Sequence, residues 1–355
     1  MKIGILTFHR AHNYGAVLQC YAMQEILKNL GHDVFVVDYY QPYVEYAYRV
    51  FCWKNILRYI KHHDIRGFYS YIMDIPMRLK RRHNFELFRL NLNLSSSCDS
   101  VTNVPSDFDV FIMGSDQIWN IYQTGNVLDR VYWGDFPSLS SVKKIAYAVS
   151  MSERGVALIP QETIKRILSS FQSVSFREKK ISEIVGTILG KECPTCLDPT
   201  LLTTASTWEA LINNKWVNRK YILTYFITPN TSMVKKIEVF ARMQGLEIIH
   251  LFPMRYSVED FVSLFKYATF VIGTSFHGTA FSLIFHRPFF SVTSGHVGDD
   301  RYISLLTKIG LSNNLLPQQN DISYPPLINW ELVDTKLESM RAMSLNYLEK
   351  NITSV

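Results

Sequence analysis

The sequence of 355 residues predicts an α/β protein with two doubly wound parallel sheets that face a central cleft. Short apolar runs alternate with segments of helical period, which is typical of buried parallel strands joined by helices. This alternation occurs twice, before and after residue 205, and the length suits two domains. Ligands of such folds lie at the carboxyl ends of the strands, so we expect the site between the two halves.

The first half opens with a strand–loop–helix–strand unit. Lys2–Phe8 is a short apolar run, and Ala16–Leu30 places apolar residues at near-helical spacing before Gly31 ends the helix. Val34–Asp38 is the next expected strand. Further strands are expected at Asp109–Met113, Lys144–Val149 and Ser173–Phe176, the last of which runs into Arg177-Glu178 and a helix.

The second half repeats the pattern after a crossing segment at Thr203–Asn218. The expected strands are Tyr221–Phe226, Glu247–Leu251, Thr269–Ile272 and Pro288–Val292. The expected helices are Ser232–Gln244, Glu259–Tyr267, Gly278–Phe285, Arg301–Ile309 and a final amphipathic helix, Glu331–Asn351. We therefore expect Rossmann-like domains at residues 1–205 and 206–330, followed by a C-terminal helix within 331–355.

A helical insert at residues 44–92 carries the charge of the protein. It holds ten lysines and arginines against four acidic residues, and so accounts for the whole formal net charge of +6. This distribution disfavours a nucleic-acid-binding protein and favours one local basic patch. The insert either forms a solvated helical face or, because tyrosines and Trp53 lie among the cations, meets an anionic membrane surface. For the membrane alternative we expect charge reversal at Arg78, Lys80, Arg81 and Arg82 to weaken binding to anionic vesicles.

Several classes of protein are excluded by what the sequence lacks. Five scattered cysteines are too few for a disulfide framework, and neither a signal peptide nor an apolar stretch suited to a membrane span is evident. We expect a cytoplasmic, reduced protein. No nucleoside-triphosphate or dinucleotide phosphate loop is present, and Cys193-Pro194-Thr195-Cys196 lacks the two further ligands that zinc needs. We expect neither a metal nor a cofactor.

The strongest local feature is a strand that turns through Gly273 and Thr274 into a helix starting near Phe276. The free N–H groups of a helix N-terminus suit a phosphate or carboxylate. Gly278 permits close backbone approach, and His277 can donate to an anion or pass a proton. The alternative is an ordinary N-cap beside a satisfied histidine.

A second feature is Arg177, at the end of a predicted strand that faces the same cleft. Its planar guanidinium matches a carboxylate or a phosphate. The alternative is an ion pair with Glu178 or another acidic residue.

Two N-terminal loops, His9–Gly15 and Gly114–Asn120, also follow strands. Their polar side chains suit sugar hydroxyls, their aromatic rings suit an apolar sugar face, and Asp116 suits a general base. Turn and cap formation is the alternative for each of them. The residues concerned are Asn13, Asp116 and Gln117 for hydroxyls, and Tyr14 or Trp119 for the sugar face.

Seven segments in order carry a family resemblance: Asn13–Val34, Gly114–Asn120, Tyr147–Glu153, Ser175–Ile181, Leu197–Leu202, Gly273–Phe289 and Arg301–Leu311. Together they resemble the bacterial polysaccharide pyruvyl transferases. That resemblance implies a fold similar to GT-B glycosyltransferases. It also implies transfer of the enolpyruvyl carbons of phosphoenolpyruvate onto two hydroxyls of a sugar, forming a cyclic pyruvate ketal and releasing phosphate. The implied acceptor is a galactose-like sugar in a lipid-linked capsular or exopolysaccharide repeat unit, reached in the cytoplasm or at the inner face of the membrane.

The resemblance also assigns residues. Arg177 matches the donor-binding arginine of the family and His277 its functional histidine, while Ser275 stands where many members have a second arginine. Arg301 is the expected substitute for that arginine, and a weakened or altered donor site is the alternative. Ser275 itself is also expected to bind the donor. The expected phosphate seat is Gly278 and Thr279, and Asp116 is the expected base. The expected acceptor-binding residues are Asn13, Tyr14, Gly15, Asp116 and Gln117.

Two other functions remain open from the sequence. A GT-B glycosyltransferase that uses a nucleotide-sugar would keep the fold, although the acidic pair expected to hold a ribose is not evident. A non-catalytic module that binds a glycan or lipid is suggested by Ser275. Phosphate release from phosphoenolpyruvate would distinguish pyruvyl transfer from both.

Overall fold

The computed structural model describes residues 1–136, 141–228, 230–295 and 297–354, which form two parallel five-stranded sheets. The first has the order β2-β1-β3-β4-β5 and the second β10-β9-β8-β6-β7. The prediction of two doubly wound sheets is confirmed. The strands are β1 (Lys2–Leu6), β2 (Asp33–Val36), β3 (Val110–Met113), β4 (Lys143–Val149), β5 (Ser173–Phe176), β6 (Tyr221–Tyr225), β7 (Glu247–His250), β8 (Phe270–Gly273), β9 (Phe289–Thr293) and β10 (Leu315–Pro317).

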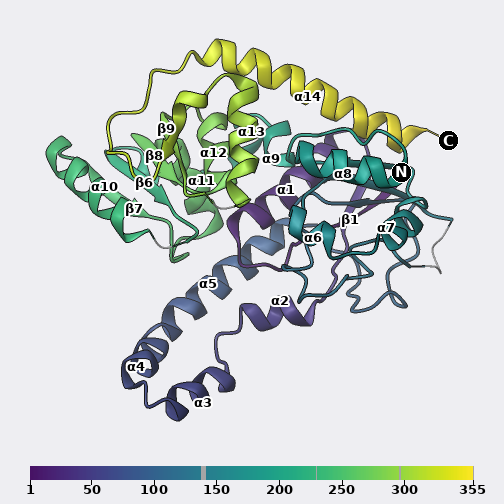
Figure 1. Ribbon diagram of the computed structural model, residues 1–355, viewed down its shortest axis with the longest axis horizontal. Coiled ribbons are helices and arrows are strands. Elements are labelled where there is room, and N and C mark those ends of the chain that lie inside the picture. The colour runs from purple at the N-terminus through teal and green to yellow at the C-terminus, as the bar shows by residue number, and fades with distance from the viewer. Residues whose placement is uncertain (137–140, 229, 296, 355) are drawn as a thin grey trace.

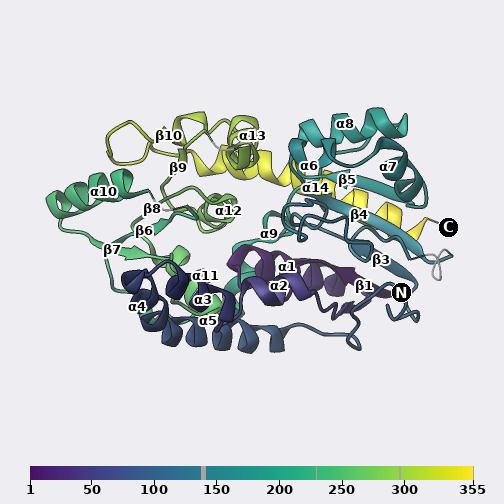
Figure 2. The ribbon, with the colours of Figure 1, turned by 60° about the horizontal axis from the view of Figure 1, so that its bottom comes forward.

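Helices connect the strands and cover both sheets (Figure 1, Figure 2). Outside the insert they are α1 (Tyr14–Asn29), α6 (Glu153–Ala157), α7 (Gln161–Leu168), α8 (Lys179–Leu189), α9 (Pro199–Leu202), α10 (Thr231–Gln244), α11 (Val258–Tyr267), α12 (Phe276–Ile284), α13 (Asp300–Ile309) and α14 (Trp330–Thr353). The sequence analysis missed α6, α7, α9 and β10. Three of these four elements have five or fewer residues, too short to show a period. The crossing segment consists of 3₁₀ turns at Ala205–Leu211 and Asn214–Trp216.

The insert forms an arm of four helices, residues 42–88, that reaches away from the body of the protein (Figure 1). The helices are α2 (Pro42–Ala47), α3 (Trp53–Lys61), α4 (Ile65–Met73) and α5 (Ile75–Phe88). α3 and α4 lie at the far end, and α5 returns to the body. Near its end, the Phe85 ring lies 5.4 Å from the His12 ring and 5.3 Å from the Tyr14 ring. These contacts anchor the arm beside the loop that precedes α1.

The C-terminal helix α14 crosses from the second sheet back to the first (Figure 1). Arg341 Nε donates to the Leu201 carbonyl at 2.7 Å, and Ser344 Oγ accepts from Leu197 N–H at 3.0 Å. Further along, the Tyr347 hydroxyl donates to the Ala146 carbonyl of β4 at 3.2 Å. Near its start, Lys336 Nζ donates to the Ile309 carbonyl of α13 at 3.2 Å, so the helix ties the two halves together. In the described part of the chain, no helix is long and apolar enough to cross a membrane.

The two halves also share a continuous apolar core. Tyr14, at the start of α1, is completely buried and stacks on Phe261 of α11 with ring centroids 4.6 Å apart. Its hydroxyl donates to the Tyr256 carbonyl at 2.8 Å. Burying an aromatic ring across the boundary stabilises one relative placement of the two sheets.

Candidate functional site

The centre of the site is Asp198, a completely buried carboxylate at the N-cap of α9. Arg177, directly after β5, donates from Nη1 to Asp198 Oδ2 at 2.7 Å. His277, in the first turn of α12, places Nε2 3.7 Å from the same oxygen. Arg177 and His277 therefore converge on one carboxylate from opposite sheets.

Further donors complete the environment of this carboxylate. Thr200 donates to Asp198 Oδ1 from its backbone N–H at 3.0 Å and from its hydroxyl at 2.7 Å, and Ser115 Oγ donates to Oδ2 at 3.3 Å. Burial alone would raise the pKa of Asp198, but His277 and Arg177 hold that pKa well below its ordinary value. Asp198 is therefore an anion that fixes the two groups around it.

Arg177 is held by contacts on several sides and keeps one donor free. Its guanidinium lies 4.8 Å from the centre of the Phe276 ring, a cation–π contact between the two halves. Nε donates to Glu178 at 3.4 Å. Among the described residues, Nη2 of Arg177 and Nε2 of His277 are buried and make no hydrogen bond. Both atoms are available to a substrate.

Arg301, in the first turn of α13, is a cation of the site without a counter-ion among the described residues. Its Nε donates to the Gly298 carbonyl at 3.2 Å, and no carboxylate of the described residues lies within ion-pair distance. Burial lowers the pKa of Arg301, and the positive charge of Arg177 lowers it further. A half-buried guanidinium beside a second one favours an anionic ligand.

A cleft of about 350 Å³ lies between the two halves, and both of them supply its walls. Asn13, Asp116 and Gln117 line it from the loops after β1 and β3, and Ser275, Phe276, His277 and Arg301 line it from the second half. Tyr43 and Tyr48, at the base of the arm, border the same cleft. The structure thus brings together most of the expected donor and acceptor residues.

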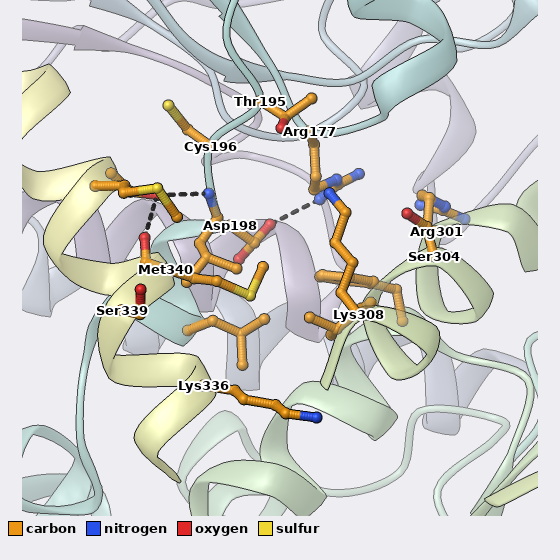
Figure 3. A pocket seen from close by; sticks show the side chains of 16 residues that line it. Arg177, Thr195, Cys196, Asp198, Arg301, Ser304, Lys308, Lys336, Ser339 and Met340 are labelled. Carbon is orange, nitrogen blue, oxygen red and sulfur yellow. Dashed lines mark hydrogen bonds and ion pairs between the residues drawn. The ribbon is translucent and has the colours of Figure 1, made fainter. Parts of the chain in front are cut away.

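A second cavity of about 400 Å³ lies on the other side of Phe276 and Arg301, below α14. Figure 3 shows Arg177, Arg301 and Lys308 around it, with Asp198 held by Arg177. Arg177 lines this cavity and His277 lines the cleft, while Phe276 and Arg301 line both. Arg301 therefore stands where the two spaces meet.

Asp116 has an unusual backbone for a non-glycine residue. Its φ is +24°, in a region that costs energy for most side chains. One carboxylate oxygen, Oδ1, accepts the N–H of Gln117 at 2.8 Å. The other oxygen has no protein partner among the described hydrogen bonds, which suits a group that accepts a proton from a hydroxyl.

Two expected aromatic contacts to a sugar are wrong, because both rings belong to the core. Tyr14 is buried against Phe261 and uses its hydroxyl on Tyr256. Trp119 is also completely buried, stacks on Trp133 at 4.6 Å and donates to the Tyr132 carbonyl at 2.8 Å. Neither ring lines the cleft.

At the expected phosphate seat, Gly278 and Thr279 already use their donors inside the protein. Ser275 caps α12: its Oγ accepts the Gly278 N–H at 3.3 Å, and its carbonyl accepts the Thr279 N–H at 3.0 Å. The Thr279 hydroxyl shares a hydrogen bond with Ser291 Oγ at 2.6 Å. Neither N–H group of the expected seat is therefore left unbonded.

Gly15 has a structural role that the sequence did not reveal. A Cβ built on Gly15 would lie 2.0 Å from Nδ1 of His277, well inside any tolerated contact. A Cβ on Gly278 would meet its nearest neighbour, Ser275 Cβ, at an ordinary 3.4 Å. Close approach thus requires glycine at position 15, in the first turn of α1, and not at position 278.

Asp198 is the central residue that sequence reasoning missed. Its segment Leu197–Leu202 contributed to the family resemblance, but no role was expected of the residue itself. Cys193 and Cys196 are both buried free thiols. In the described ranges, no group of three or more potential metal ligands is found.

Comparisons with known proteins identify the family, whereas the solved structures that they find are only distantly similar. An alpha-glucosyltransferase in complex with UDP and DNA has 9% identity, covers 98% of this chain and 91% of its own, and gives a TM-score of 0.47. The UDP-GlcNAc 2-epimerase of Methanocaldococcus jannaschii has 12% identity, covers 96% and 93%, and gives 0.43. At these TM-scores neither likeness supports a conclusion about ligand or activity. No curated protein matches the sequence.

The family model for polysaccharide pyruvyl transferase matches residues 13–296, which is 284 of the 355 residues. The match includes every residue of the Arg177–Asp198–His277 cluster and leaves Arg301 just outside. The chain belongs to the polysaccharide pyruvyl transferase family.

Proposed function

We propose that the protein transfers the enolpyruvyl carbons of phosphoenolpyruvate onto two hydroxyls of a sugar in a lipid-linked repeat unit. The products are a cyclic pyruvate ketal and phosphate. The observation that carries the proposal is Arg301, a cation without a carboxylate partner in the described part of the chain, which shares one cavity with Arg177 and the cleft with His277. A small donor with two anionic groups suits such a site, because each group requires a cation or several hydrogen-bond donors.

The donor is proposed to lie around Arg301, with one anionic group reaching the free Nη2 of Arg177. Arg301 takes the place of the arginine that many family members have at the position of Ser275. Ser275 serves instead as the N-cap of α12, which orients His277 in the first turn of that helix. The methylene of the donor then faces His277.

The chemistry divides between His277 and Asp116. His277 protonates the methylene carbon to a methyl group, a first sugar hydroxyl forms a bond to the central carbon, and Asp116 accepts the proton of that hydroxyl. A second hydroxyl of the same sugar then bonds to this carbon as the carbon–oxygen bond to phosphate breaks, and its proton leaves with the phosphate. Positioned acid and base groups contribute about 10²–10⁴-fold each to such a reaction.

The acceptor is proposed to enter from the side of the first sheet. Asn13, Asp116 and Gln117 offer polar groups there, and Tyr43 and Tyr48 of the arm offer aromatic surface. A galactose-like sugar, as the family resemblance implies, would place its hydroxyl pair between Asp116 and the donor. No cofactor is needed for these steps.

The proposed function is tested by incubating the protein with phosphoenolpyruvate and a panel of lipid-linked glycans. We expect one glycan to gain the mass of a pyruvyl unit, with release of an equal amount of phosphate. His277→Ala should lower turnover by about 100-fold or more because the proton donor is lost, with acceptor binding retained. His286→Ala, which removes an exposed histidine paired with Asp334, is the control. Turnover of nucleotide-sugars instead, or full turnover by His277→Ala, would reject the proposal.

The role of Arg301 predicts a specific defect in donor binding. Arg301→Gln removes the charge while keeping most of the side chain, and a charge-assisted hydrogen bond is worth about 1.5–3 kcal/mol. The KM for phosphoenolpyruvate should therefore rise by about 10- to 100-fold, as measured by phosphate release at varied donor concentration. Arg242→Gln, on the exposed face of α10, should leave this KM unchanged. An unchanged KM in Arg301→Gln would remove Arg301 from the donor site.

The contact between Gly15 and His277 predicts opposite outcomes for two glycine variants. Gly15→Ala forces the imidazole to move, because the new methyl group occupies the space of Nδ1. Turnover should fall by about tenfold or more, as expected for a misplaced catalytic group. Gly278→Ala should keep turnover and should not lower the free energy of unfolding, because alanine favours a helix and meets only ordinary contacts. Equal activity of both variants would contradict the described geometry.

A further inference from the structure

The arm tip, residues 51–73, exposes an unusual amount of apolar surface. Of the 27 large hydrophobic side chains that are exposed in the described part of the chain, nine lie in these 23 residues. Within α3 and α4, only Ile56 and Tyr71 are buried. An exposed apolar patch of this kind marks a surface that binds something else.

The apolar residues of α3 lie on one face. Trp53, Leu57 and Ile60 follow a spacing of i, i+4 and i+7, and are 68%, 61% and 60% exposed. Residues at this spacing share a stripe along a helix. A parallel stripe of cations lies one residue further along the helix, at Lys54, Arg58 and Lys61, all of which are exposed. An apolar stripe bordered by cations is typical of helices that lie in a membrane interface.

The second helix of the tip repeats this arrangement. On α4, an exposed stripe follows the spacing i, i+3, i+4 and i+7, with Arg66 beside it. The acidic residue of the tip, Asp64, caps α4 by accepting the Gly67 N–H at 2.8 Å. Four cations against this one acid make the tip strongly basic. The residues of the stripe are Ile65, Phe68, Tyr69 and Ile72.

Two of the cations expected to meet a membrane, Arg78 and Arg81, are used inside the arm. Arg78 donates to the carbonyls of Val50 and Tyr71 at 3.1 and 3.0 Å, and its guanidinium lies 4.0 Å from the Tyr71 ring centre. Arg81 packs 5.7 Å from the Tyr48 ring centre. Charge reversal at these two residues would disturb the arm itself. Charge reversal at the exposed cations of the tip avoids this disturbance, which it would cause at Arg78 and Arg81 within the set Arg78, Lys80, Arg81 and Arg82.

We propose that the arm tip docks on an anionic lipid surface. The apolar stripes of α3 and α4 enter the boundary between headgroups and acyl chains, and the neighbouring cations pair with lipid phosphates. A second copy of the chain is disfavoured as the occupant, because it would bring two basic surfaces together. Tyr43 and Tyr48 connect the base of the arm to the cleft, so docking would hold the cleft near a lipid-linked acceptor. Only this last consequence depends on the proposed function.

The test measures sedimentation of the full chain with vesicles, without donor or acceptor. We expect binding to vesicles of phosphatidylcholine with phosphatidylglycerol, weakening with added salt, and little binding to phosphatidylcholine alone. A triple variant, Lys54→Glu, Arg58→Glu and Lys61→Glu, should bind more than about tenfold more weakly. The control triple variant, Lys191→Glu, Lys220→Glu and Lys235→Glu, makes the same change of net charge on exposed residues elsewhere and should bind as the wild type.

A second measurement reports on the apolar stripe. Trp53 is largely exposed, so its fluorescence should shift to shorter wavelength on vesicle binding, and Trp53→Phe should remove that shift. Leu57→Ser with Ile60→Ser should weaken binding, with circular dichroism confirming that the arm remains helical. Equal vesicle binding by the wild type and both tip variants would overturn the proposal. So would dimerisation through Trp53 and Leu57, seen by light scattering, without any vesicle binding.

Discussion

The site depends on one interaction, the burial of the Asp198 carboxylate between Arg177 of the first half and His277 of the second. Taking a carboxylate out of water costs several kcal/mol unless charged partners and hydrogen bonds surround it. Asp198 has both, because Thr200 and Ser115 donate to the oxygens and the Arg177 guanidinium pairs with the carboxylate. Removing one partner of such a pair costs about 3–5 kcal/mol, so the arrangement resists change. It fixes Arg177 and His277 relative to each other across the boundary between the sheets.

The rest of the site follows from this anchoring. Because Asp198 neutralises one donor face of Arg177, the free charge of the site comes mainly from Arg301 on α13. Ser275 caps α12, while Gly15 leaves room for the imidazole from the opposite side. Arg301 of the second half then faces the polar side chains of the first half across the cleft. The α14 helix and the buried Tyr14 hold the two sides together.

The fold followed from the sequence where local pattern decides it. The run Ser173–Phe176 was predicted with its observed bounds, because a short apolar segment between polar residues has few alternatives. α9 was missed because four residues show no period. Arg177 and His277 were singled out because each follows a predicted strand, and the structure places Arg177 in the wall of the second cavity and His277 in the wall of the cleft. Asp198 was missed because its role comes from contacts 21 and 79 residues away in the chain. The same limit explains why the role of Gly15 was missed. Both Gly15 and Gly278 lie in the first turn of a helix, and only the tertiary structure shows that Gly15 is the one packed against His277.

The most direct test of this account is the crystal structure of the protein with phosphoenolpyruvate in the absence of acceptor. The account predicts one anionic group of the donor within about 3 Å of the Arg301 guanidinium and of Nη2 of Arg177, with the methylene carbon facing His277. Asp198 should keep its contact with Arg177. A donor bound away from Arg301, or an Arg177 that leaves Asp198 to meet it, would contradict the account.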